Sequence, residues 1–522
     1  MIKYKNLFFI SSIIILTFLA FSPSLRNGFI QWDDHLYVVD NPVVKTLSVE
    51  NINHIFGSFF VSNYIPITML SYSLDYHLHG PSSFYFHHTN LILHLLNCIL
   101  VFWLFLIISG DSVVSFITTV LFAIHPLRVE SVAWIGERKD VLYALFFLGA
   151  LISYCYYLKE KRNGGYYYFS MLLFVLSLMS KPMATTLPLE LILMDYFFSR
   201  KYDKFVILDK IPFFTLSILF GAITMLAMNL GKHMLQAIFF DIHIKLTLAS
   251  YSLVMYFKNI FIPSSLSAIY ALPRSTLKPY LLIIPLCIIF LAAFRSSKKI
   301  IFGMAFFLIA LLPVIRFIPF AGGTIIADRY TYVPSIGISF ITAEGIVWIY
   351  RKTALRFFFA RIFIIMSLTA IITALSFLTY YRCKIWKDDF SLWNDAILKH
   401  QYSVIAYNNR GMKYMERNEL DKAISDFTKA FSMDKSEITA LTNRAIAYAK
   451  KGDFYHATED ANINIKLDPK KVESYYLRGL IYLMDNKSES ALADFNKAID
   501  IDPNYTAAIS KRNLLLKKKS NY

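Results

Sequence analysis

The sequence has 522 residues, of which 56% are hydrophobic and 16% aromatic, and it carries a formal net charge of +17. This length excludes a single ordinary soluble domain, and the apolar content exceeds what a soluble core needs. The positive charge does not indicate nucleic-acid binding, because many lysines and arginines stand in short clusters between apolar runs, where they orient a membrane protein. The composition predicts an integral membrane protein that has no nucleic-acid partner.

Apolar runs of membrane-spanning length occupy the first three-quarters of the chain. Segments such as 7–25, 141–158 and 357–378 carry almost no charge, as a crossing of the hydrocarbon core requires. Counting every such segment predicts a membrane domain of 11 to 13 spans over residues 1–381. The positive clusters at the N-terminus and at 159–162 favour the cytoplasm, so the first outer loop, 26–88, lies on the opposite side.

The later charge clusters do not agree with a count of twelve. The clusters 295–299 and 351–356 favour the cytoplasm, which predicts a C-terminal tail on the outer side, whereas twelve spans would return it to the cytoplasm. Two segments could explain why the number of spans is odd and not even. The segment 186–198 is short and flanked by proline, which is typical of a re-entrant loop, and the segment 231–245 could hide another crossing.

The last quarter of the chain repeats with a period of 34 residues. Arg410, Arg444 and Arg478 are spaced by this interval, which is the period of tetratricopeptide (TPR) helix pairs. Tyrosine, alanine, phenylalanine and aspartate positions fall in the same register. The predicted TPR domain, 382–522, has these parts: a degenerate half repeat at 388–400, repeats at 404–437, 438–471 and 472–505, and a capping helix at 506–519. The fold class is therefore all-α, a polytopic helical membrane domain followed by an α-solenoid, whose concave groove is expected to bind a protein or peptide.

Polar residues gather on the predicted outer face. Asp33 and Asp34 follow the first span closely. Two acidic residues at this position either form an ordinary turn or belong to a functional site. The segment 125–140 holds three acids and three bases between two apolar spans. Charged groups held beside a membrane pair with one another or with a polar ligand, so this segment is a candidate site; the alternative is a solvated loop.

Two further polar segments are expected on the same face. Lys181 stands at the outer end of one span and Arg329 just before another, and both could hold an anionic phosphate. Five histidines also occur in this part of the chain, but their spacing fits no zinc signature and one of them lies in a span, so no metal site is predicted. These are His77, His79, His87, His88 and His94.

The sequence resembles the transmembrane and TPR repeat-containing O-mannosyltransferases, which are GT-C glycosyltransferases that use polyprenyl-phosphate sugars, and their prokaryotic relatives. The resemblance covers nearly the whole chain, and the stretch 125–140 is its most specific part. Its other carriers are Trp32-Asp33-Asp34, the stretch 63–68, Lys181-Pro182-Met183, the stretch 328–334, and the repeats. It implies a GT-C-like fold whose acidic residues act on the non-cytoplasmic face, just after span one.

The resemblance implies roles for ten residues. A carboxylate takes the proton of an acceptor hydroxyl while the sugar moves with inversion from a lipid phosphate, and basic groups stabilise the departing phosphate. We assign the general base to Asp34, or else to Asp33. Glu130, Glu137 and Asp140 are assigned as groups that position the acceptor or pair with other charged residues. The candidates for binding the donor phosphate are Arg128, Arg138, Lys139, Lys181 and Arg329.

The sequence therefore predicts an enzyme that transfers a sugar, with mannose expected, from a polyprenyl phosphate to a protein hydroxyl. No cofactor is required, and the need for a divalent metal stays open. The three repeats fit a prokaryotic relative in the cytoplasmic membrane with a periplasmic or extracellular tail, or in a eukaryote the endoplasmic reticulum. The alternatives are an envelope glycan or lipid acceptor, and a membrane-anchored TPR scaffold. A transporter is disfavoured because most charge sits at span ends.

Overall fold

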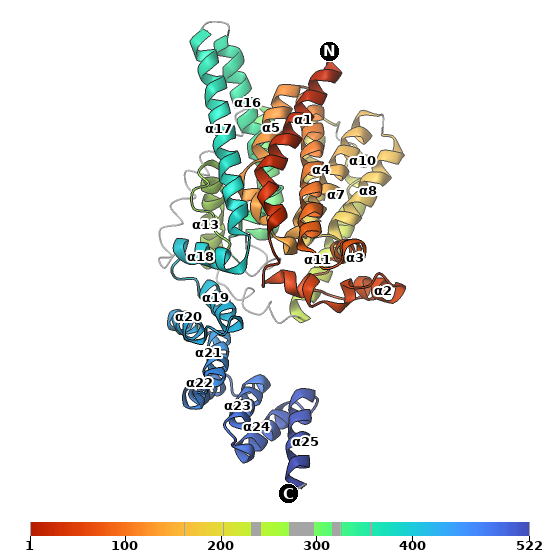
Figure 1. The fold of residues 1–522 in the computed structure, drawn as a ribbon. Coiled ribbons are helices and arrows are strands. Elements are labelled where there is room, and N and C mark those ends of the chain that lie inside the picture. The colour runs from red at the N-terminus through yellow and green to blue at the C-terminus, as the bar shows by residue number, and fades with distance from the viewer. Residues whose placement is uncertain are drawn as a thin grey trace. The chain divides into compact units, whose positions relative to one another are not determined.

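The computed structural model describes residues 2–160, 162–201, 203–230, 242–270, 297–315, 324, 326–354 and 358–520. The chain divides into two compact units, Met1–Asp388 and Asp389–Tyr522. Over the described ranges the secondary structure is helical and no strand occurs, which confirms the all-α class (Figure 1). The first unit extends beyond the predicted boundary at 381, because its last helix continues to Ile385.

The described part of the first unit is built mainly from apolar helices. The helices are α1 (Ile2–Phe21), α2 (Val49–Gly57), α3 (Pro66–His79), α4 (Ser83–Ser109), α5 (Ser112–Ala123), α6 (Val129–Ala133), α7 (Arg138–Lys159), α8 (Gly164–Leu178), α9 (Leu187–Phe197), α10 (Lys204–Leu208), α11 (Ile211–Leu230), α13 (Ile242–Phe261), α15 (Lys298–Leu311), α16 (Ser335–Ala354) and α17 (Phe358–Ile385). Short 3₁₀ turns carry much of the polar sequence, and they include Ile135–Glu137, Pro182–Thr186 and Asp328–Thr331.

Five stretches of helix in the described residues are long and apolar enough to cross a membrane, and the bent pair α5 and α6, which turn by 56°, adds a sixth if it counts as one span. The chain is thus a membrane protein. The five are Tyr4–Arg26, Ser83–Ser109, Ile135–Lys159, Lys204–Met228 and Phe358–Ile385. The count of 11 to 13 spans stays a prediction, since its segments at 231–241 and 280–294 lie outside the described residues.

Helix α17 shows the surface expected of a lipid-facing span. Phe359 is 84% exposed, Phe363 71% and Met366 65%. In water such a row of apolar side chains would be costly, whereas lipid tails are as apolar as the side chains themselves. The exposed apolar face of α17 is therefore consistent with a position against the bilayer.

Helix α4 carries a buried polar stripe that contacts several other segments of the unit. His87, Asn90, His94 and Asn97 recur at intervals of three and four residues, so they share one helix face, and each is at most 1% exposed. His94 contacts the Tyr332 hydroxyl (2.7 Å) and the Ala123 carbonyl (3.0 Å), and Asn97 donates to the Val141 carbonyl (2.8 Å). The stripe thus fixes three chain segments that surround the polar cluster described below.

Helices α15 and α16 cross at a pair of glycines. A Cβ atom on Gly337 would stand 2.2 Å from the Gly303 carbonyl oxygen, and one on Gly303 would stand 2.6 Å from the Gly337 carbonyl oxygen. Neither position can carry a side chain unless the helices separate. The two glycines therefore allow the backbones of α15 and α16 to lie close together.

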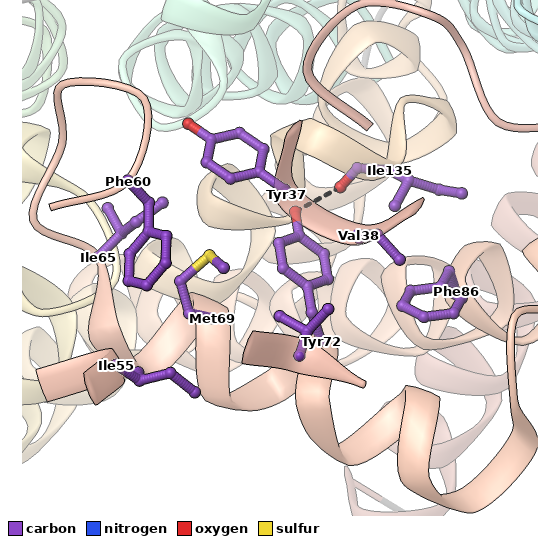
Figure 2. Close-up of a cluster of buried hydrophobic side chains, with 10 residues drawn as sticks. Tyr37, Val38, Ile55, Phe60, Ile65, Met69, Tyr72, Phe86 and Ile135 are labelled. Carbon is purple, nitrogen blue, oxygen red and sulfur yellow. Dashed lines mark hydrogen bonds between the residues drawn. The ribbon is translucent and has the colours of Figure 1, made fainter. Parts of the chain in front are cut away.

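The first outer loop folds onto its own apolar cluster. Tyr37, Ile55, Ile65 and Met69 are fully buried within it, and the Tyr72 hydroxyl donates to the Ile135 carbonyl at 2.7 Å (Figure 2). Burial of such side chains stabilises the loop by about 1.5–3 kcal/mol each. The loop is therefore a packed element that supports the residues next to it in sequence.

The second unit is a helical solenoid. Its helices are α18 (Asp389–Lys399), α19 (Val404–Glu416), α20 (Leu420–Met433), α21 (Ile438–Lys451), α22 (Phe454–Leu467), α23 (Val472–Met484), α24 (Ser488–Ile501) and α25 (Thr506–Ser520). Each of the three predicted repeats corresponds to one helix pair. Helix α18 lies within the predicted half repeat, and α25 follows the predicted capping segment to within one residue.

Paired small and large residues close each repeat. A Cβ on Gly411 would stand 2.7 Å from the Phe427 ring, and one on Gly479 would stand 2.6 Å from the Phe495 ring. The middle repeat has Ala445 and Ala461 at the matching positions, and both lie in one buried cluster. The first and third repeats therefore place a phenylalanine ring against a glycine, whereas the middle repeat has two alanines at these positions.

Each repeat also has a buried ion pair. The guanidinium of Arg410 binds both carboxylate oxygens of Asp426 at 2.8 Å, and Arg444 and Arg478 bind Asp460 and Asp494 in the same way. The remaining Nη1 of each arginine reaches back 16 residues, to the second helix of the preceding repeat or half repeat. This ladder joins neighbouring repeats as well as the two helices of one repeat.

Candidate active site

The two acidic residues after α1 lie in different environments. Asp34 is fully buried, and its carboxylate accepts the backbone N–H of Ile30 at 2.8 Å and that of Gly136 at 2.6 Å. It therefore ties the first outer loop to the segment 135–137. Gly136 allows this close contact, because a Cβ would stand 3.0 Å from Asp33 Cβ and 3.1 Å from Asp34 Oδ1 and would require these side chains to shift.

Asp33 is the accessible member of the pair. Its side chain keeps 20% of its surface exposed, and Oδ2 lies 3.7 Å from Nζ of Lys139. Burial raises the pKa of Asp33 above its ordinary value, and Lys139 offsets part of that rise. A carboxylate with a raised pKa and an exposed edge can accept a proton from a ligand.

Glu137 is the centre of the cluster. It is 1% exposed, and its two oxygens meet three cations: Lys139 at 3.1 Å, Lys181 at 3.1 Å and Nε of Arg329 at 3.3 Å. A charge buried this deeply persists only when it is paired. The three cations come from three segments that are far apart in the sequence, so Glu137 gathers them at one place.

Two more carboxylates complete the cluster. Asp140, in the first turn of α7, binds Lys181 at 2.5 Å and accepts the Ser131 hydroxyl at 3.1 Å. Glu130 pairs with Nη1 of Arg329 and accepts its backbone N–H at 2.9 Å. The structure thus brings together seven of the ten predicted site residues, with Asp34 directly beside them. The seven are Asp33, Glu130, Glu137, Asp140, Lys139, Lys181 and Arg329.

Arg329 keeps one donor unengaged. Burial alone would lower the pKa of Arg329, but Glu130 and Glu137 outweigh burial and hold that pKa above its ordinary value, so the side chain stays charged. Its Nε, Nη1 and backbone N–H all have carboxylate partners, whereas Nη2 has no hydrogen-bond acceptor among the described residues. The guanidinium is therefore held in place and can still donate to an anionic ligand.

The other two predicted phosphate ligands are engaged elsewhere. Arg128 is fully buried and donates to the backbone carbonyls of Thr331 (2.8 Å) and Tyr332 (2.6 Å). Arg138, also fully buried, pairs with Asp75 at 2.6 Å and donates to Asn90 at 2.8 Å. Their contacts fix the segment 328–334 and the start of α7, so both arginines position the cluster from outside it.

A stack of three tryptophans borders the cluster, and the sequence analysis did not anticipate it. Trp134 lies between Trp32 and Trp386, at ring-centroid distances of 4.5 and 5.4 Å. Trp386 belongs to the segment that follows α17, and the carbonyl of Lys387 in that segment accepts the N–H of Gly28 at 2.9 Å. The end of the first unit is therefore packed against the loop that carries Asp33.

The buried polar stripe on α4 was also missed. It places Asn90 against the Trp134 carbonyl and against Nε of Arg138. The sequence did contain a signal, because polar residues at 87, 90, 94 and 97 share one face of an otherwise apolar span. A polar face inside a span indicates contact with protein or with a polar site.

Comparison with known proteins gives matches in both units. Two tetratricopeptide repeat models match residues 404–437 and 472–505. A protein O-mannosyl-transferase of Caenorhabditis elegans is 26% identical over 467 residues, which cover 83% of this chain and 63% of that protein. The human protein O-mannosyl-transferase TMTC1 is 34% identical over 157 residues, which cover 28% of this chain and 18% of that protein. The chain thus spans less than two-thirds of the length of these relatives.

Among solved structures, the first TPR of Spaghetti (RPAP3), bound to an HSP90 peptide, is 26% identical, with a TM-score of 0.21 over 22% of this chain and 93% of that one. The match to the Caenorhabditis elegans transferase extends over most of the chain, whereas the TPR matches are confined to its last quarter. The chain is thus similar in sequence to protein O-mannosyl-transferases, and its second unit carries tetratricopeptide repeats.

Proposed function

We propose that this chain transfers a sugar, mannose in the first instance, from a polyprenyl-phosphate donor to a hydroxyl of a protein, on the non-cytoplasmic face of its membrane. The observation that carries the proposal is the accessible carboxylate of Asp33 at the edge of a buried cluster that holds three cations. The names of the relatives, protein O-mannosyl-transferases, support the reaction class.

Asp33 is the general base in this proposal, in preference to Asp34. Both oxygens of Asp34 accept backbone N–H groups, so protonating that carboxylate would remove a contact that holds the loop. Asp33 has an exposed edge and a raised pKa. It takes the proton of the acceptor hydroxyl while the acceptor oxygen bonds to the anomeric carbon from the face opposite the phosphate, which inverts that carbon.

The leaving group is the polyprenyl phosphate. As the bond between the anomeric carbon and the phosphate oxygen breaks, the electron pair stays on the phosphate, whose charge needs a fixed cation nearby. Arg329 offers the unengaged Nη2, and Lys181 has two carboxylate partners for three N–H donors. These two are the proposed phosphate ligands, and the other predicted cations have a structural or positioning role.

The second unit is proposed to hold the acceptor. TPR solenoids present concave surfaces that bind extended peptides, which favours a protein over an envelope glycan or lipid as acceptor. Asp33, the segment 130–140, Lys181 and Arg329 lie at one end of the membrane helices. From the charge clusters at the N-terminus and at 159–162 we infer that this end faces the non-cytoplasmic side.

The test compares single variants in membranes supplied with radiolabelled polyprenyl-phosphate mannose and an endogenous protein acceptor. Asp33→Asn should abolish transfer and leave the melting temperature of the purified protein near that of the native chain. Asp34→Asn should lower the melting temperature, because it weakens a buried contact. Asp40→Asn is the matched control, since Asp40 lies in the same loop with its side chain 70% exposed, paired to His35 and not to the cluster.

The proposal fails if Asp33→Asn transfers label as fast as the native chain at equal membrane levels. If label from the native chain enters glycan or lipid and not protein, the acceptor class is wrong and the reaction class stands. If no sugar is transferred to any acceptor, the membrane-anchored scaffold becomes the better description of the chain.

A further inference from the structure

A single lysine joins the proposed base to the buried cluster. Nζ of Lys139 lies 3.7 Å from Oδ2 of Asp33, 3.1 Å from Oε1 of Glu137 and 3.4 Å from the Tyr37 hydroxyl. It also lies 4.9 Å from the centroid of the Tyr37 ring. An ammonium has three N–H donors, and here three protein oxygens surround it.

Lys139 is therefore a poor phosphate ligand. Its side chain is 9% exposed, and each of its donors faces an oxygen of the protein. Lys181 is buried to the same degree, but it contacts Glu137 and Asp140 and has no contact with Asp33. The two lysines thus share Glu137 and differ in whether they reach the base.

We propose that Lys139 is a positioning residue that holds Asp33 in its ionised form and in its place for proton transfer, and that it binds no substrate. This inference rests on the proposed function. The groups that face Asp33 are Lys139 and Glu137 from the start of α7 and the turn before it, and Arg329 from the turn before α16. Of these, Lys139 is the cation with a direct ion pair to Asp33.

The sign of the pH effect follows from these charges. A base works only when it is ionised, so transfer falls as the pH drops through the pKa of Asp33. Burial raises that pKa, and Lys139 lowers it. Removing the lysine should therefore raise the pKa of Asp33 further and move the acid limb of the pH profile toward higher pH, by about one to three pH units.

The experiment measures kcat/KM against pH for the full-length chain in nanodiscs, with polyprenyl-phosphate mannose and a serine- and threonine-containing peptide drawn from a protein that the native chain labels. Lys139→Gln should displace the acid limb upward by at least one pH unit and recover most of the native rate on the alkaline side. Lys139→Arg keeps a positive charge beside Asp33 and should leave the limb within about 0.5 pH unit of native. Lys181→Gln should lower the rate and leave the limb where it is.

Three outcomes would overturn the inference. A Lys139→Gln profile lowered equally at every pH would indicate a structural role only. A raised KM for the lipid donor with an unmoved limb would indicate phosphate binding. If Lys139→Gln does not reach the membrane, the Lys139→Arg variant provides the test. An acid limb displaced by one pH unit in this variant, which retains the positive charge, would also contradict the proposal. An inactive native chain would instead refute the proposed function itself.

Discussion

The two units of this chain use buried ion pairs in different ways. In the TPR unit each of the repeated arginines, Arg410, Arg444 and Arg478, has its own aspartate, and the pair recurs every 34 residues. In the membrane unit one carboxylate, Glu137, is shared by three cations from three segments. In the first arrangement both carboxylate oxygens are bound by the guanidinium, and the pair stabilises the fold. The second arrangement leaves the carboxylate of Asp33 accessible at its edge, where it can accept a proton.

The largest effect is expected at the shared carboxylate. Glu137→Gln leaves Lys139, Lys181 and Arg329 without their common partner in a buried setting. Removing one partner of a buried ion pair costs about 3–5 kcal/mol, so we expect a large fall in melting temperature and loss of transfer. A thermal melt of the purified variant measures this. A native melting temperature would show that the other carboxylates suffice and that Glu137 is not the centre of the cluster.

A smaller loss of stability is expected when one of the arginine–aspartate pairs of the TPR unit is removed. Arg444→Ala leaves Asp460 with 5% of its side chain exposed and without its bidentate partner. The cost should be about 1–3 kcal/mol, confined to the second unit because the pair lies within it. Hydrogen exchange should show faster exchange in α21 and α22 and unchanged exchange in α4 and α7. Equal loosening of the membrane unit would contradict the separation of the two units.

The steric coupling between Gly411 and Phe427 can be tested by a double-mutant cycle. Gly411→Ala places a Cβ 2.7 Å from the Phe427 ring, and overpacking of this kind costs about 1–3 kcal/mol. Adding Phe427→Ala recreates the pair of alanines that the middle repeat already has. The double variant should therefore be more stable than the sum of the single changes predicts. Strict additivity in denaturant unfolding would mean that the two positions do not compensate.

The smallest effect is expected at a surface pair. Lys451 contacts Asp421 at 2.5 Å, but both side chains are largely exposed, at 48% and 81%. Water and salt screen such pairs, so Lys451→Ala should leave the melting temperature and the transfer rate unchanged. This variant is the control for Arg444→Ala, since it removes an ion pair of similar length from the surface of the same unit. A clear loss of stability would refute burial as the deciding variable.

The TPR unit could be predicted almost completely from sequence, and the membrane unit could not. The 34-residue period locates the helices and the small residues between them, because each repeat contacts mainly its neighbours, whereas the arginine–aspartate pairs were found only in the structure. The number of spans stays a prediction, since apolar length alone does not distinguish a crossing from a buried or re-entrant helix. The tryptophan stack involves residues 32, 134 and 386, and no local pattern connects positions so far apart.

The sequence by itself determined the class of protein, the two-part organisation and the set of residues from which a site could be built. Only the tertiary structure separated Asp33 from Asp34, and Lys139 and Arg329 from Arg128 and Arg138. The physical reason is that residues of the same charge are chemically equivalent in the sequence, and only their neighbours in the fold distinguish them. Which carboxylate accepts backbone N–H groups, and which keeps an exposed edge beside a lysine, depends on chain segments more than 100 residues away.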